Sequence, residues 1–225
     1  MFQSGFTFSQ NIIVKYISYK NPLSSSEILE KYKNLPDNVK EKILEKALLK
    51  YKDQFTLYHS KAKSMYLFEG RKFDSEVDEE FMRGPFILDH YRDFINKKII
   101  LIADFVPDNY QVEIGFNEIK TELKQDTMTI NGYKCKKAIV TFLGDSKAVV
   151  WYAPNIPISD GPSWFLGLPG LVIKVSINNE LITEAINIDF VSDPIKINIP
   201  ERENIVSYNK YRKGLAMKWI SAYDR

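Results

Sequence analysis

Residues 167–171 read Gly167-Leu168-Pro169-Gly170-Leu171, and they stand between an aromatic, proline-rich approach and a run of alternating apolar residues. Proline fixes its own φ near the value of the second residue of a β-turn, and glycine supplies the positive φ that a type II turn needs next. Leu168 precedes a proline and is therefore restricted to extended backbone. The stretch predicts a type II turn at Pro169-Gly170 that leads into a β-strand.

The two segments after this turn have the period of half-buried strands. Alternation predicts that Leu171, Ile173, Val175 and Ile177 share one face of the first strand. In the second strand it places one apolar set together, namely Ile182, Ile186, Ile188 and Phe190. A sheet built from such hairpins has one buried face and one solvated face.

Similar short segments, rich in β-branched and aromatic residues, fill most of the chain. They predict strands at 11–19, 54–60, 63–69, 86–91, 98–105, 110–114, 127–130, 134–142, 147–153, 171–177 and 181–191. Sequential strands of this kind pair as a meander, and a strongly twisted sheet of about ten strands tends to curl. We therefore expect a curved, mainly antiparallel sheet in the form of an open half-barrel.

Two helices are expected between the first two strands. Ser24 and Glu27 have the spacing of a capping box, which predicts a short helix to about Asn34. Asp37 caps a second helix, whose apolar positions recur at three- and four-residue spacing: Ile43, Leu44, Ala47, Leu48 and Tyr51. This amphipathic helix is predicted to pack on the sheet, so the expected fold class is α+β.

Composition limits the class of protein. The 225 residues suit one domain, which we place at residues 11–225. The formal net charge of +2 gives no basic field for a polyanion, so nucleic acid is not an expected partner. No apolar run approaches the ~20 residues of a membrane span, so no transmembrane segment is expected. Residues 1–10 are either the remnant of a signal peptide or a disordered tail.

A longer stretch around the glycine turn carries a family resemblance. The residues from Trp151 to Pro157, those from Asp160 to Leu166 and the turn itself resemble the GLPGLI family of Bacteroidetes envelope proteins. Val172 stands where the family name has isoleucine, and the resemblance covers roughly residues 96–190. That family has no agreed biochemical activity. The resemblance implies export to the periplasm or cell surface.

Titratable residues give no strong catalytic or metal signal. His59 and His90 are the only histidines, and neither has ligand partners at the spacing of a zinc site. Cys135 has lysine neighbours but lies in a strand pattern typical of a small buried residue. Asp104 ends an apolar strand, and the acidic run 74–80 lacks the glycine and spacing of a calcium loop. We expect no cofactor and no metal.

The last candidate group is a set of aromatic residues in a loop that prolines make rigid. Trp and Tyr anchor binding surfaces, and a rigid loop loses little entropy when it binds. We therefore take six residues as candidates for binding a ligand or partner: Trp151, Tyr152, Trp164, Phe165, Leu168 and Leu171. The alternative is that Trp164 and Phe165 plug the end of the sheet as hydrophobic cover. The two interpretations are compatible.

Three functions remain open. The first is a non-catalytic envelope module that binds an apolar ligand or a protein segment in the concave sheet. The second is a hydrolase or peptide-processing enzyme, for which Asp89, His90 or Asp104 would lie within hydrogen-bonding reach in a cleft. The third is a structural subunit that docks on an envelope partner through an exposed sheet edge.

Overall fold

One long sheet dominates the fold in the computed structural model, which describes residues 11–20, 29–30, 32–41, 51–73, 89–105, 108–142, 146–211 and 213. Its twelve strands lie in the order β12-β6-β5-β4-β3-β2-β1-β11-β10-β9-β8-β7. Their bounds are β1 Asn11–Lys20, β2 Tyr51–His59, β3 Lys63–Phe73, β4 Asp89–Asp93, β5 Lys98–Phe105, β6 Asp108–Gly115, β7 Lys120–Ile130, β8 Tyr133–Phe142, β9 Ser146–Ala153, β10 Leu171–Ile177, β11 Leu181–Val191 and β12 Ile205–Ser207. A short 3₁₀ helix, η2, spans Phe116–Glu118.

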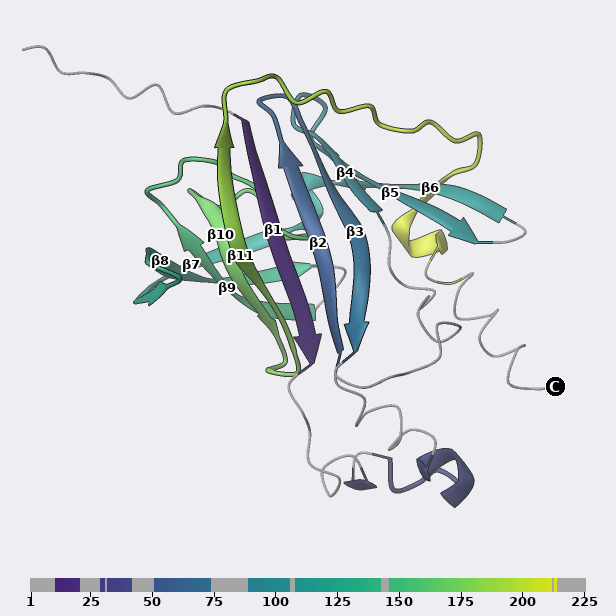
Figure 1. Cartoon of the computed structure of the whole chain (residues 1–225). Helices are drawn as coiled ribbons and strands as arrows, with labels where there is room; N and C mark the ends of the chain where they lie inside the picture. Colours follow the sequence, from purple (N-terminus) through teal and green to yellow (C-terminus); the bar gives the residue numbers. More distant parts are fainter. Residues whose placement is uncertain are drawn as a thin grey trace, which may run out of the picture.

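Two meanders make up this sheet. The first runs from β1 to β6 and the second from β7 to β11, and each strand pairs antiparallel with the next. The N-terminal strand β1 joins them by pairing with β11. At the far edge, β12 pairs in parallel with Gln111–Glu113 of β6. The sheet is therefore open, and Figure 1 shows its outer strands crossing behind the central strands.

The predicted antiparallel sheet is confirmed, but the predicted helix packing is not. Strands 98–105, 171–177 and 181–191 have the expected bounds, whereas β2 already begins at Tyr51 and β7 is longer than expected. Residues 37–41 are helical, and Figure 1 draws them beyond the ends of the central strands. In the first predicted helix, residues 29–30 are helical and 32–34 form a turn. Tyr51, predicted as the last apolar position of the second helix, instead begins β2. The other residues of both predicted helices lie outside the described residues. Among the described residues, no helix has the length and apolar character needed to cross a membrane.

Burial follows the strand period in β1, where Ile12, Val14 and Tyr16 are each at most 1% exposed. Register shifts interrupt that period in other strands, including β10 and β11. In β10 the register shifts between Val172 and Lys174, so Ile173 has no direct partner on β9. The predicted common face of β10 is therefore wrong: Ile173 packs in one core cluster and Val175 in another.

The segment of residues 154–170 connects β9 to β10 and contributes side chains to three hydrophobic clusters. Ile156 and Ile158 belong to the cluster around β1 to β3. Phe165 and Leu168 pack in the cluster of β8, β9 and β10. Leu166 packs in the cluster of β5 and β6. The segment thus fills the interior of the curved sheet and ties its two arms together.

The glycine turn at the end of this segment differs from the predicted type II turn. The amide of Gly170 donates to the carbonyl of Leu168 at 2.8 Å, and the amide of Leu171 donates to Ile156 at 3.0 Å. Pro169 therefore centres a three-residue turn. Gly170 has φ +152°, and a Cβ there would lie 2.3 Å from the carbonyl oxygen of Ala153. Glycine is needed because two backbone segments approach closely.

Substitution of Gly170 by alanine tests this close approach. Gly70 is a matched control, because its φ is +155° and a Cβ there meets nothing within 4 Å. We expect Gly170→Ala to lower the free energy of unfolding by about 2–4 kcal/mol, at least about 1 kcal/mol more than Gly70→Ala. Urea denaturation of both variants measures the difference. Equal losses would show that the approach of Ala153 imposes no constraint.

Candidate functional site

A polar cluster lies inside the sheet, around the carboxylate of Asp160. This side chain is fully buried in the 154–170 segment. Its Oδ2 lies 2.8 Å from Nδ1 of His59, and its Oδ1 lies 3.5 Å from Nε of Arg92. Oδ1 also accepts a hydrogen bond from the amide of Gly161 at 2.8 Å. The Asp160 carboxylate therefore contacts polar groups of the sheet and of its own segment.

Three strands present the residues that meet Asp160. His59 of β2 lies directly opposite Ser64 of β3, and Ser64 lies directly opposite Arg92 of β4. Residues that pair directly across strands point to the same face, so these three side chains form one row. All three are at most 8% exposed. The strand register of the first meander thus places these three side chains where they contact the 154–170 segment.

Arg92 holds the backbone of the segment as well as the carboxylate. Its Nη2 donates to the carbonyls of Gly161 at 2.9 Å and Ser163 at 2.5 Å. Its Nη1 donates to Oγ of Ser64 at 3.3 Å. A guanidinium has five donors in a fixed planar geometry, which lets one residue bind several acceptors at once. Arg92 therefore fixes the path of the chain on both sides of Pro162.

The cluster keeps Asp160 ionised. Burial by itself raises the pKa of this carboxyl, but the charge of Arg92 and the contacts with His59 and Ser64 outweigh it and hold the pKa below its usual value. A buried carboxylate with a lowered pKa and filled acceptor sites is a poor proton acceptor. The arrangement is that of a structural ion pair.

A second contact in the cluster joins a hydroxyl to an imidazole. Oγ of Ser163 lies 3.2 Å from Nε2 of His90, and Ser163 has φ +49°. The ring of Trp164 meets His90 edge-on at a centroid distance of 5.1 Å. His90 is 7% exposed, whereas Ser163 is half-buried. A hydroxyl beside an imidazole is the pairing that nucleophilic catalysis uses.

The six candidate binding residues have different environments. Tyr152, Phe165, Leu168 and Leu171 are buried in the core, at most 2% exposed. Trp151 and Trp164 are half-buried. Nζ of Lys137 lies 6.0 Å from the ring centre of Trp151, while Trp164 packs edge-on to Tyr208 at 5.6 Å. Only the two indoles combine packing with access to solvent, and a binding role for the set stays a prediction.

The thiol singled out in the sequence is buried. Cys135 is 1% exposed, and burial raises the pKa of its thiol to about 11. A thiol of this kind is inert at neutral pH. The side chain of Asp104 and the acidic run 74–80 lie outside the described residues. Within the part of the chain that the structure describes, no group of three His, Cys, Asp or Glu side chains is placed to hold a metal ion.

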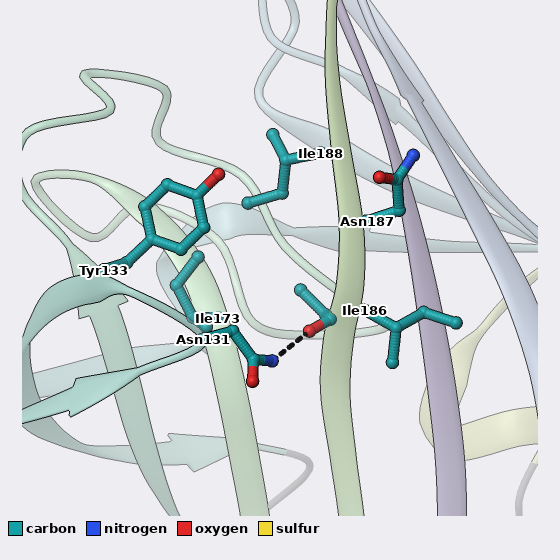
Figure 2. A pocket seen from close by; sticks show the side chains of 7 residues that line it. Asn131, Tyr133, Ile173, Ile186, Asn187 and Ile188 are labelled. Carbon is teal, nitrogen blue, oxygen red and sulfur yellow. Dashed lines mark hydrogen bonds between the residues drawn. The ribbon is translucent and has the colours of Figure 1, made fainter.

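Two hollows lie beside the hairpin of β7 and β8, away from the polar cluster. The smaller, of about 170 Å³, is formed by Asn131, Tyr133, Ile173, Ala185, Ile186, Asn187 and Ile188, whose side chains Figure 2 shows. The larger, of about 950 Å³, is open and is lined by Thr127, Met128, Thr129, Gly132, Lys134, Cys135, Lys136, Pro154 and Asn155. Sequence reasoning named none of the residues of the smaller hollow as a site.

Fold and site together define an open-sheet domain whose interior is occupied by its own chain. The sequence model of the family described as "N-glycanase peptide, N-terminal domain" matches residues 97–212, just over half of the chain. The chain belongs to this family. No curated protein sequence matches it.

Solved structures of PNGF-II share the fold. The P21 crystal form has a TM-score of 0.52 and the C2 form 0.53, each with 16% sequence identity. Each match covers 91% of this chain and 32% of PNGF-II. The chain therefore spans about a third of the length of the solved proteins that it matches, and the likeness at this identity concerns the fold alone.

Replacement of Asp160 by asparagine tests the importance of the buried pair. Asparagine keeps the shape but removes the charge, which leaves Arg92 buried without a counterion. We expect Asp160→Asn to lower the free energy of unfolding at pH 7 by about 3–5 kcal/mol in urea denaturation. Glu113→Gln is the control, since its pair with Lys98 is partly exposed, and it should cost at most about 1 kcal/mol. Similar losses for both variants would contradict the assignment.

Acid pH extends the same comparison. Because folding lowers the pKa of Asp160, its stabilisation is complete above the unfolded-state pKa of about 3.9 and is lost as the pH falls through the folded-state pKa. The stability difference between the wild type and Asp160→Asn should therefore shrink from pH 7 to about pH 3. A difference that stays constant would show that the Asp160 carboxyl does not titrate in this way.

Proposed function

We propose that this chain is a non-catalytic recognition domain that binds part of a glycosylated polypeptide on its outer surface. Its ligand contacts lie around the β7–β8 hairpin and not in the concavity of the sheet. This proposal keeps the binding role expected from the sequence. It moves the ligand from the interior to the hairpin.

The occupied interior is the observation that carries the proposal. Residues of the 154–170 segment pack in three of the core clusters, so they take space that an apolar ligand would need. Asp160 and Arg92 are fully buried, and their contacts are made within the chain. The two hollows described above lie elsewhere, beside the hairpin. These two hollows offer a ligand a place to bind without unfolding the core.

Family membership supports a glycosylated ligand. The matching family is described as an N-terminal domain of N-glycanase. PNGF-II is about three times as long as the part of it that aligns with this chain in structure. A domain that makes up a third of such a protein is free to serve recognition while another part carries the chemistry. The half-buried Trp151 lies on β9 and packs on the first core cluster. Aromatic residues with one accessible face are frequent in binding surfaces.

Export is part of the same proposal. The resemblance of residues 96–190 to GLPGLI envelope proteins supports a place in the periplasm or at the cell surface. A glycosylated or protein partner in the envelope suits that location. The predicted packing of the early amphipathic helix on the sheet also remains a proposal.

A second candidate function, a hydrolase, is favoured by the contact between Ser163 and His90. In that reaction the Ser163 oxygen would attack an acyl carbonyl while His90 accepts its proton, and His90 would then return the proton to the leaving group. The 3.2 Å separation fits this role. Against it, Arg92 holds Ser163 by its carbonyl inside the plugged core, and neither hollow borders the pair.

Titration with an N-glycosylated peptide separates these functions. The same peptide without its sugar is the ligand control, and Ser163→Ala is the protein control. We expect isothermal calorimetry to give a dissociation constant on the order of 100 μM for the glycopeptide, unchanged in Ser163→Ala, and mass spectrometry to recover the peptide intact. Cleavage that Ser163→Ala abolishes would establish the hydrolase. Absence of any preference for the glycosylated form would refute the recognition role.

A further inference from the structure

The smaller hollow has the features of a built site. It lies where the tip of the β7–β8 hairpin approaches β10 and β11 (Figure 2). Asn131 and Gly132 form the two-residue turn, with φ of +49° and +82°, as a type I′ turn requires. Nδ2 of Asn131 donates to the carbonyl of Ala185 at 2.8 Å. The hairpin is thus tied to β11 across the rim of the hollow.

Two bulges open the floor of the hollow. Ile173 is the extra residue on β10, where the register shifts between Val172 and Lys174. Ile186 is the extra residue on β11, because Lys15 faces Asn187 while Tyr16 faces Ala185. Bulges bend a strand and change the direction of side chains, and they are frequent beside functional sites. Both strands therefore depart from regular pairing at the same place.

The lining carries no charge. Beside the hairpin its polar groups are the phenol of Tyr133 and the amide of Asn131, and its apolar surface comes from isoleucine and alanine side chains. Asn187 also lines the hollow, but Figure 2 shows its side chain across β11 from Tyr133, and its direct partner on β1 is the exposed Lys15. Figure 2 shows the Tyr133 hydroxyl turned toward the space between the hairpin and β11. The site offers the amide oxygen of Asn131 as an acceptor and a phenol donor beside an aromatic ring.

This chemistry matches one neutral sugar residue. A sugar ring has an apolar C–H face, which packs on an aromatic ring, and hydroxyl groups that both donate and accept hydrogen bonds. The volume of about 170 Å³ equals that of about six liquid water molecules, which limits the occupant to about one ring. An anionic group would find no cation in this lining and would be desolvated without compensation.

We propose that the hollow bounded by Asn131, Tyr133 and Ile188 is a subsite for a single uncharged sugar residue. This inference rests on the proposed recognition function and identifies where the glycan is held. Tyr133 supplies the stacking surface, and the amide oxygen of Asn131 accepts a hydrogen bond from a sugar hydroxyl group. Ile173 and Ile188 supply apolar walls.

NMR titration of the ¹⁵N-labelled protein tests the subsite directly. The probes are N-acetylglucosamine and galactose, with glucuronate as the anionic control. We expect both neutral sugars to shift the amides of residues 131–133 and 185–188, with millimolar dissociation constants, and glucuronate to bind at least about fivefold more weakly. A difference of fivefold corresponds to about 1 kcal/mol.

Two substitutions locate the binding. Tyr133→Leu, which removes the ring, and Tyr133→Phe, which removes only the hydroxyl group, should each weaken neutral-sugar binding at least about fivefold, or about 1 kcal/mol. The matched control is Tyr58→Leu on β2, which should leave it unchanged. ¹H–¹⁵N spectra verify that each variant is folded. Asn131 is left intact, because its amide ties the hairpin to β11.

The outcomes separate the subsite from the proposed function. Neutral-sugar shifts confined to the hollow and lost in both site variants support the subsite. If the glycopeptide binds but the site variants bind it like the wild type, the subsite is wrong and the recognition function stands. If neutral sugars bind in the hollow but the glycopeptide is not preferred, the recognition function fails alone. Equal binding of glucuronate, or no shift with either neutral sugar at about 50 mM, overturns the subsite.

Discussion

The ion pair between Arg92 and Asp160 is the constraint on which the rest of the structure depends. Both side chains are fully buried, so each would carry a large desolvation penalty without the other. A pair of this kind adds little net stability compared with apolar packing, and its geometry here is set by the hydrogen bonds that both side chains make with neighbouring groups. Here that geometry sets the position of the 154–170 segment, because Arg92 also binds the carbonyls of Gly161 and Ser163. The three hydrophobic clusters then form around a segment whose path is already fixed.

The filled interior decides where function lies. Many curved sheets hold a ligand in their concavity, but here the chain supplies its own occupant, from Ile156 to Leu168. Groups that a ligand could reach therefore lie where the strand pairing is irregular. The bulges at Ile173 and Ile186 and the tip of the β7–β8 hairpin provide such a place. The recognition function proposed above would use this irregular part of the sheet.

Much of the sheet could be predicted from the sequence, because strand alternation is a local property. The strand at 98–105 shows this, since its apolar residues alone define it. The parallel strand β12 was missed because three residues carry no period and its partner β6 is distant in the sequence. Alternation also failed at Ile173 and Ile186, where a bulge shifts the faces without any residue that marks it. The polar cluster was not predicted, since His59 and Asp160 are 101 residues apart and Arg92 lies just beyond the strand predicted at 86–91.

Amide hydrogen exchange tests the central claim most directly. If the Arg92–Asp160 pair locks the 154–170 segment into the core, the amides of Gly161, Gly167 and Val172, which all donate hydrogen bonds within it, exchange only through global unfolding. Their free energies of opening then equal those of buried amides in β9 and β10. Free energies lower by about 2 kcal/mol or more would show that the segment opens independently. That result would contradict the view that the interior is permanently occupied.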